Sequence, residues 1–263
     1  MKINTITASS NALLKKIRSL QERQARQKTG LFLIEGERLV LEALNRDIEL
    51  EAIVVVDNYL DKESELLERL DTVTAVSPAL FKELVTTSSP CKVVAIGRWQ
   101  LSDLNATLKD GATTVLWGEN IQDPGNLGTM IRSALAFGVD ALVLTSSVDP
   151  FNPKVVRSAM GGLFDLPICL CPLNRAAELL KQYEFEIVAF SPEAKESVDQ
   201  FSFAKKTALL VGNEGAGLTN EAEGLSDRVL VIPQKPDVES LNVGVAASLA
   251  LYERMKQTTR LKS

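Results

Sequence analysis

Histidine is absent from the 263 residues of this sequence. Because the imidazole group titrates near neutral pH, its absence excludes Ser-His-Asp catalysis, Cys-His catalysis and histidine-ligated metal sites. The three cysteines, Cys91, Cys169 and Cys171, are an odd number without Cys-x-x-Cys spacing. This pattern predicts reduced, mostly packed thiols of a cytosolic protein, and the sequence contains no constellation that predicts a metal site.

Long apolar runs are also missing. No stretch approaches the roughly 18 residues of a membrane-spanning helix, and the first residues, MKINTITASSNALLKK, lack the apolar core of a signal peptide. We therefore expect a cytoplasmic protein without a membrane partner. With 45% hydrophobic and 24% charged residues, the composition is that of a globular protein, and the length predicts about two domains.

Positive charge is concentrated at one end of the chain. The 29 basic and 34 acidic residues give a net charge of −5, which does not by itself indicate a nucleic-acid-binding protein. Residues 1–30, however, contain seven basic residues and one acidic residue, a net charge of +6. A local basic patch of this kind is compatible with phosphate binding, and a solvated polar helix is the alternative.

Short apolar runs alternate with helical patterns in the first hundred residues. We expect strands at 31–36, 53–56, 73–76 and 93–96, and helices at 11–28, 37–44, 63–70 and 78–85. Apolar runs of four residues between helices predict a small α/β sheet that is covered on both faces. The polar segment 101–111 is predicted to link a domain of residues 1–100 to a second domain of residues 112–263.

The second half repeats this rhythm more strongly. The expected strands are 114–117, 141–144, 187–190, 208–211 and 229–232, and the expected helices are 127–137, 155–163 and one that ends at 179–182. This alternation predicts a mostly parallel sheet whose ligands bind outside the carboxyl ends of the strands. The final helix, 240–256, is apolar nearly all round, which predicts burial in the core or against a second subunit.

Three segments that follow predicted strands carry unexplained polar side chains, and the first two of them also contain glycines. In the first, 118–128, Asp123-Pro124-Gly125 is a turn signal, and Asn126 together with Arg132 on the following helix is expected to line one side of a cleft. In the second, 211–218, the G-x-x-G-x-G spacing differs from the dinucleotide fingerprint. Its glycines would let the backbone approach a flat ligand such as a nucleoside, and a structural loop with a solvated Glu214 is the alternative.

The third segment is 232–243. Ser240 is the expected N-cap of the final helix, whereas capping does not explain Asn242 in the first helical turn. Each segment alone is a weak signal. Because all three follow strands of one predicted sheet, they can converge on one crevice.

The three segments also carry a family resemblance. DPGNLGTMIRSALAFG, VGNEGAGL and IPQKPDVESLNV, in this order, resemble the three signature motifs of the SpoU (TrmH-like) branch of the SPOUT RNA 2′-O-methyltransferases. The intervening NPKVVRSAMGGLFDLPI is similar to the corresponding family segment, and the likeness covers about residues 114–256. The first hundred residues, especially GLFLIEGERLVLEAL, resemble the substrate-binding domain of many members, which is similar to ribosomal protein L30e.

The resemblance implies an α/β fold with a small L30e-like domain followed by a trefoil-knotted, parallel-sheet SPOUT domain. It further implies S-adenosylmethionine as cofactor and a homodimer through the knot region. By motif match, the family's cofactor-binding positions are Gly212, Asn213, Gly217, Ile232 and Leu241. Its catalytic positions are Asn126, Arg132, Glu214, Ser240 and Asn242. Glu214 could pair with Arg132 or shape the pocket.

The function that the resemblance implies is 2′-O-ribose methylation of RNA, and of ribosomal RNA in particular. Lys15, Lys16, Arg23 and Arg26 are the candidate phosphate-binding residues of the basic segment. The alternatives are a transfer RNA 2′-O-methyltransferase and an inactive RNA-binding or ribosome-assembly factor on the same fold. Two residues depart from the third motif, in which a glycine is usual at Pro236 and a methionine at Gln234.

Overall fold

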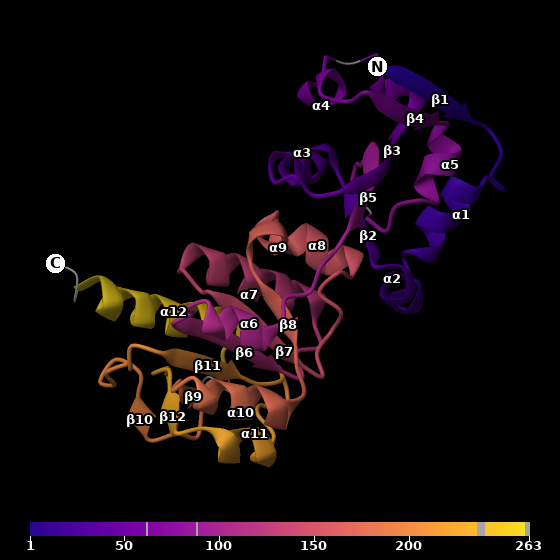
Figure 1. Ribbon diagram of the computed structural model, residues 1–263. Helices are drawn as coiled ribbons and strands as arrows, with labels where there is room; N and C mark the ends of the chain where they lie inside the picture. The colour runs from indigo at the N-terminus through magenta and orange to yellow at the C-terminus, as the bar shows by residue number, and fades with distance from the viewer. Residues whose placement is uncertain (62, 88, 236–239, 261–263) are drawn as a thin grey trace. The chain divides into compact units, whose positions relative to one another are not determined.

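The computed structural model describes residues 1–61, 63–87, 89–235 and 240–260. The chain groups into two compact units, each with its own sheet (Figure 1). Unit 1 consists of Met1–Gln100 together with Asp149–Phe164, and unit 2 consists of Leu101–Val148 together with Asp165–Ser263. Residues 1–100 of the predicted first domain lie in unit 1, whereas the inclusion of residues 149–164 in that unit was not expected.

Unit 1 is built on a five-stranded mixed sheet in the order β1-β4-β3-β5-β2. Its strands are β1 (Lys2–Ile6), β2 (Leu31–Glu35), β3 (Leu50–Val56), β4 (Thr72–Val76) and β5 (Val93–Arg98). Strand β5 runs antiparallel to both β2 and β3, whereas β4 is parallel to β1 and β3. Strand β1 was not predicted, because its alternating polar sequence forms a largely exposed edge strand without an apolar run.

Helices cover this sheet because its strands other than the edge strand β1 are largely apolar on both faces. They are α1 (Ala12–Ser19), α2 (Arg23–Thr29), α3 (Glu37–Asn45), α4 (Glu65–Glu68) and α5 (Pro78–Lys82), with a 3₁₀ turn η1 (Asp57–Tyr59). On β2, Leu31 and Leu33 join a core cluster that contains Leu14 and Ile17 of α1. The intervening Phe32 lies against the rings of other phenylalanines instead, as the alternation of a strand requires.

The single helix predicted at 11–28 is wrong, because the chain turns between α1 and α2. The guanidinium group of Arg26 explains the break. Its Nη1 donates to the carbonyl oxygens of Leu20 and Gln21 at 2.9 and 2.8 Å, so these turn carbonyls are paired without a continuing helix.

Residues 149–164 are held in unit 1 by a buried ion pair and by aromatic contacts. Arg26 Nε donates to Asp149 Oδ2 at 2.7 Å, and the Arg26 side chain is 2% exposed. The ring of Phe151 stacks on Trp99 with centroids 4.5 Å apart. The segment forms α8 (Pro153–Ala159) and the start of α9 (Gly162–Asp165), and α8 packs against β2.

Unit 2 is built on a seven-stranded, entirely parallel sheet in the order β10-β12-β9-β11-β6-β7-β8. Its strands are β6 (Thr114–Glu119), β7 (Ala141–Thr145), β8 (Ile168–Leu170), β9 (Glu186–Phe190), β10 (Glu196–Ser197), β11 (Thr207–Val211) and β12 (Arg228–Val231). The parallel sheet confirms the prediction from the strand and helix alternation, and the trefoil knot stays a prediction.

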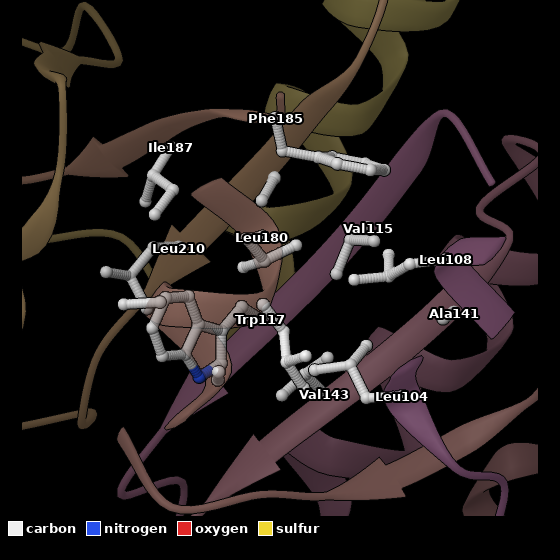
Figure 2. Packing of buried hydrophobic residues seen from close by; sticks show 14 of the residues in the cluster. Leu104, Leu108, Val115, Trp117, Ala141, Val143, Leu180, Phe185, Ile187 and Leu210 are labelled. Carbon is white, nitrogen blue, oxygen red and sulfur yellow. The ribbon is translucent and has the colours of Figure 1, made fainter. Parts of the chain in front are cut away.

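The helices of unit 2 are α6 (Leu104–Lys109), α7 (Pro124–Ala136), α10 (Leu173–Gln182), α11 (Asn220–Leu225) and α12 (Val243–Arg260). Figure 2 shows part of the core on one face of the sheet, where Trp117 lies among aliphatic side chains. Leu104 and Leu108 of α6 belong to this core, so the predicted linker 101–111 is largely a helix of unit 2.

Helix α12 packs against α7 and β11. Ala247, Ala250 and Leu251 are buried, as predicted for a helix with several apolar faces. Val245, Leu249 and Tyr252 instead form an exposed stripe, with 44%, 43% and 49% of their surfaces accessible. Among the residues that the structure describes, no helix is long and apolar enough to cross a membrane.

Candidate functional site

The carboxyl ends of neighbouring parallel strands define one cavity of about 430 Å³ in unit 2. Strands β12, β9 and β11 are adjacent in the sheet, and the loop that follows each of them lines this cavity. All five predicted cofactor positions lie in its wall: Gly212, Asn213, Gly217, Ile232 and Leu241. Glu214 and Ser240 also line it, so the second and third segments do converge on one crevice.

The loop that follows β11 is a tight closed turn. Asn213 and Gly217 exchange two backbone hydrogen bonds, of 2.9 and 3.0 Å, and Gly217 has φ +70°, which favours glycine. A Cβ atom built on Gly212 would lie 2.4 Å from the backbone of Gly217 and Leu218. Glycine at 212 is therefore needed for the loop to fold back on itself and form one wall of the cavity.

Glu214 joins this loop to the first segment. Its carboxylate accepts hydrogen bonds from the backbone N–H groups of Gln122 and Asp123 at 3.3 and 3.1 Å. It also accepts from the side-chain amide of Asn126 at 3.0 Å. Asn126 in turn accepts from Asn242 Nδ2 at 2.7 Å. The structure therefore brings Asn126, Glu214 and Asn242 together at the edge of the cavity.

These donors also change the acidity of Glu214. Partial burial on its own would raise the pKa of the carboxyl, but the hydrogen bonds from Asn126 and from nearby backbone N–H groups stabilise the ionised form. The net effect is a pKa below the ordinary value of 4.5. Glu214 is therefore a carboxylate at neutral pH, fixed as an acceptor and not as a source of protons.

Asn242 has a second role that was not predicted. Its Oδ1 accepts from the backbone N–H groups of Gly244 and Val245 at 3.0 and 3.2 Å, and its carbonyl accepts from Ala246. Asn242 is thus the N-cap of α12, and the expectation that Ser240 would cap the helix is wrong. Ser240 is exposed and lies on the cavity wall.

Arg132 lies on α7, six residues after Asn126. The two side chains do not share a face, since a separation of six residues rotates an α-helix by about 240° relative to the starting position. Arg132 is exposed, and among the described residues no hydrogen bond or ion pair holds it. The predicted one-sided cleft of Asn126 and Arg132 is therefore absent from this part of the structure, and Glu214 pairs with Asn126 instead of Arg132.

The basic residues of unit 1 differ in their availability. Lys15 and Arg23 are exposed, whereas Lys16 is half-buried and pairs with Glu51. Arg26 is the exception, because its buried guanidinium is paired with Asp149. The prediction that Arg26 contacts RNA phosphate is corrected accordingly. A cation fixed by a carboxylate and two carbonyls inside the fold does not reach a phosphate at the surface.

Several residues of the site were not predicted. Asp123 caps α7 by accepting from the Asn126 N–H at 2.9 Å. The loop after β9, with Ser191 and Glu193, lines the cavity. Glu119, at the end of β6, is buried and holds Thr219 beside the cavity. A detectable signal for the β9 loop was its place after a predicted strand. The signal for Glu119 was a charged residue at the end of the apolar run 115–118.

Comparison with known protein families gives two matches. Residues 113–252 match the SpoU rRNA Methylase family, which is just over half of the chain. Residues 11–95 match the MRM3-like substrate binding domain. Together the matches include all three polar segments, 118–128, 211–218 and 232–243, and most of unit 1.

Similar proteins cover nearly the whole chain. A 23S rRNA (guanosine(2553)-2′-O)-methyltransferase of Bacillus subtilis is 34% identical over 94% of this chain and 97% of its own length. A 23S rRNA (uridine(2479)-2′-O)-methyltransferase of Streptomyces viridochromogenes is 32% identical over 90% of this chain and 87% of its own.

Solved structures agree with these relatives. The SpoU methyltransferase AviRb from Streptomyces viridochromogenes, in complex with the cofactor AdoMet, superposes with a TM-score of 0.84 at 29% identity, covering 95% of this chain and 98% of that one. The AdoMet-bound rRNA methyltransferase from Sinorhizobium meliloti has a TM-score of 0.83 at 27% identity, covering 97% and 98%.

Proposed function

The chain belongs to the SpoU rRNA methylase family, and from this premise we propose that it transfers a methyl group from S-adenosylmethionine to a ribose 2′-hydroxyl of ribosomal RNA. One observation carries the proposal. Glu214 lines the cavity in which the cofactor positions converge, and it also hydrogen-bonds Asn126 of the predicted catalytic set. Glu214 is thus common to the cavity proposed for the cofactor and to the hydrogen-bonded cluster of Asn126, Glu214 and Asn242.

The cavity suits the cofactor in size and in lining. Ligand pockets typically enclose about 300–1,000 Å³, and this one has about 430 Å³ between three strand-end loops. Gly212 and Gly217 keep one wall free of side chains, so that backbone groups can contact a flat adenosine. When bound, S-adenosylmethionine supplies an electrophilic methyl group on its sulfonium. The protein has to orient an RNA ribose beside it.

Asn126 and Asn242 are suited to hold that ribose. Both carry neutral amides whose orientation is set by their hydrogen-bond partners, and fixed donors and acceptors can bind hydroxyl groups without reorganising. Glu214 positions Asn126, and Ser240 offers a hydroxyl on the cavity wall. Such positioning contributes to the rate by aligning the 2′-oxygen with the methyl group.

Arg132 would act on the RNA substrate as a cation. A guanidinium carries a delocalised positive charge and offers hydrogen-bond donors but no acceptor. We therefore assign it stabilisation of the developing alkoxide, or a bidentate contact with the neighbouring phosphate. Its exposed position on α7 is compatible with approach by an RNA strand.

Unit 1 would supply RNA affinity. Its match to a substrate binding domain and the exposed Lys15 and Arg23 support this assignment. RNA, as opposed to DNA, follows from the reaction, because only RNA offers the 2′-hydroxyl. The names of two relatives point to 23S rRNA as their substrate, and we extend ribosomal RNA to this chain. A cytoplasmic location remains part of the proposal.

A homodimer is also part of the proposal. The exposed stripe of Val245, Leu249 and Tyr252 on α12 adjoins α7, where Leu135 is 41% exposed and Phe137 contacts Tyr252. Contiguous exposed apolar side chains of this kind mark interaction surfaces. Arg132 is the i,i+3 neighbour of Leu135 on α7, so a dimer through this stripe would bring Arg132 close to the interface.

Methyl transfer from isotopically labelled S-adenosylmethionine tests the function. We expect the purified protein to label the 2′-oxygen of a nucleotide in ribosomal RNA from cells that lack it, and not in ribosomal RNA from cells that contain it. Labelling of transfer RNA alone would replace the substrate, and cofactor binding without transfer to either RNA would favour an RNA-binding factor.

A further inference from the structure

Glu119 is a buried carboxylate that the mechanism above does not use. It ends strand β6 and is 4% exposed. Both of its oxygens accept hydrogen bonds from one residue: Oε2 from the backbone N–H of Thr219 at 3.0 Å, and Oε1 from the Thr219 hydroxyl at 2.6 Å. Burying a charge is costly unless it is compensated by hydrogen bonds, so this contact decides where Thr219 lies.

Thr219 stands at a sensitive point of the cofactor cavity. Its two neighbours in the chain, Leu218 and Asn220, both line the cavity. The Thr219 hydroxyl also accepts from the N–H of Ala222 at 3.1 Å and so caps α11, whose Asn220 and Glu223 belong to the wall. The Thr219 hydroxyl therefore links the end of β6 to the start of α11, directly after the loop that follows β11 (residues 212–218, the glycine loop).

The Asn213 side chain holds the first part of the glycine loop. Its Oδ1 accepts from the N–H groups of Gly215 and Ala216, and its Nδ2 donates to the Asn120 carbonyl, each at 2.9 Å. The Asn213–Gly217 bridge closes the loop on itself, and Glu214 attaches its middle to residues 122–126. Glu119 attaches its far end to the sheet. We propose that Glu119, through Thr219, is a positioning residue that sets cofactor affinity by holding residues 212–220 in the binding conformation. This rests on the proposed function of the cavity.

The molecule contains a matched control for this arrangement. In unit 1, Glu35 is also 4% exposed, and its Oε1 accepts from the backbone N–H and the hydroxyl of Thr86 at 2.8 and 2.9 Å. The two sites share a buried glutamate and both donors of one threonine, and Glu35 differs in that it also pairs with Arg157 at 2.6 Å. Only the Glu119 site adjoins the cavity residues. Replacing either glutamate by glutamine should lower the stability of the protein, but only the replacement of Glu119 should lower its affinity for the cofactor.

The experiment measures binding of S-adenosylhomocysteine by calorimetry in the full-length protein, with thermal unfolding as a parallel readout. We expect Glu119→Gln to weaken binding at least five-fold and Glu35→Gln to leave it within two-fold of wild type, while both lower the melting temperature. Hydrogen exchange at residues 212–220 should accelerate in Glu119→Gln only. Hydrogen exchange and S-adenosylhomocysteine binding both measure the state of residues 212–220 directly, independently of the rate of methyl transfer.

Thr219 keeps the test decisive if Glu119→Gln fails to fold, since Thr219 is exposed. Thr219→Val should weaken binding as Glu119→Gln does, and Thr219→Ser, which keeps both donors, should restore it to within two-fold. Variants at 119 and 219 that bind like the wild type would overturn the inference and leave the proposed function intact. A wild-type protein that binds no S-adenosylhomocysteine would overturn both.

Discussion

Asn126 Oδ1 accepts a hydrogen bond of 2.7 Å from Asn242 Nδ2, although 116 positions separate the two residues. The bond fixes which end of the Asn126 amide faces α12, and the other end donates to Glu214 at 3.0 Å. Each of the three polar segments, 118–128, 211–218 and 232–243, contributes one residue to this series of hydrogen bonds. The cluster is therefore a direct consequence of the parallel sheet, which brings the ends of β6, β11 and β12 to one edge.

Glu214→Gln should lower turnover at least ten-fold, with a smaller effect on cofactor affinity. A glutamine side chain has one acceptor oxygen in place of the two oxygens of the charged carboxylate. It therefore cannot accept all the hydrogen bonds from Asn126 and from the backbone N–H groups of residues 122 and 123, and the Asn126 amide loses its fixed orientation. Single-turnover methylation and calorimetric binding measure the two effects separately. A variant with wild-type turnover would exclude a positioning role for Glu214.

The lowered pKa of Glu214 also predicts a pH dependence of stability. A carboxyl whose pKa is lower in the folded protein than in the unfolded chain contributes stability above the unfolded pKa. That contribution disappears as the pH falls through the folded value. We expect the difference in unfolding free energy between wild type and Glu214→Gln to shrink below about pH 4.5, the ordinary value. Denaturant titrations at pH 7 and at acidic pH would show it, and a difference that stays constant contradicts the assignment.

Arg132→Ala should abolish methyl transfer while cofactor affinity stays within a few-fold of wild type. Arg132 is exposed on α7 and does not line the cavity, so its cation is available to RNA and not to adenosine. Arg132→Lys keeps the charge without the planar fork, and it distinguishes a bidentate role from a simple positive charge. Retention of more than about a tenth of the wild-type turnover, a barrier change under roughly 1.4 kcal/mol, would remove Arg132 from the mechanism.

The sequence predicts five of the seven strands of unit 2, because β6, β7, β9, β11 and β12 each contain a short, continuous apolar run. The three-residue β8 and the polar, two-residue β10 were not predicted. Val115, Leu116 and Trp117 are all fully buried, as that pattern requires. The same local rule fails at β1, which is a polar edge strand. The three polar segments could be assigned to one sheet edge from their position after strands, without any knowledge of their contacts.

The remaining errors arise from contacts between distant parts of the chain. The break between α1 and α2 depends on Arg26, whose carboxylate partner Asp149 is 123 positions away. Nothing near residue 26 in the sequence predicts that partner. The roles of Asn242 and Ser240 were exchanged for a different reason. Both are good N-cap residues, and only the observed start of α12 at Val243 decides between them.

Arg26→Ala should destabilise the protein strongly. Removal of the Arg26 guanidinium leaves the carboxylate of Asp149 buried without this cation. Breaking a buried ion pair in this way lowers the free energy of unfolding by about 3–5 kcal/mol. Arg18 is the matched control, because it pairs with Glu83 at 2.6 Å while both side chains are partly exposed. Arg18→Ala should change stability by about 1 kcal/mol or less. Urea unfolding monitored by circular dichroism compares the two, and equal effects would contradict the structural role of the buried pair.

Leu249→Glu should convert a dimer into monomers without unfolding the chain. Leu249 is 43% exposed, so a carboxylate there can be hydrated in a single chain but would be buried unpaired in the proposed interface. Gln182→Glu adds the same charge at an exposed position near the end of α10 and should leave the assembly unchanged. Sedimentation at micromolar concentration measures both variants. A wild-type protein that sediments as a monomer would remove the dimer from the proposal.

Replacement of Lys15, Lys16 and Arg23 by glutamine should weaken RNA binding and flatten its dependence on salt. Lys15 and Arg23 are exposed, and Lys16 shares its charge with Glu51. For a single strand, each lost phosphate contact reduces the slope of log affinity against log salt by roughly 0.7. Two full contacts and one weakened contact therefore predict a change between about 1.4 and 2.1.

A control variant with Lys109, Lys181 and Lys205 replaced by glutamine alters the net charge equally at exposed positions of unit 2. Filter binding over a series of salt concentrations compares the two variants, with cofactor affinity expected to be unchanged in both. If both variants shift the slope equally, the RNA surface is not confined to unit 1, and the basic segment acts only through the net charge of the molecule.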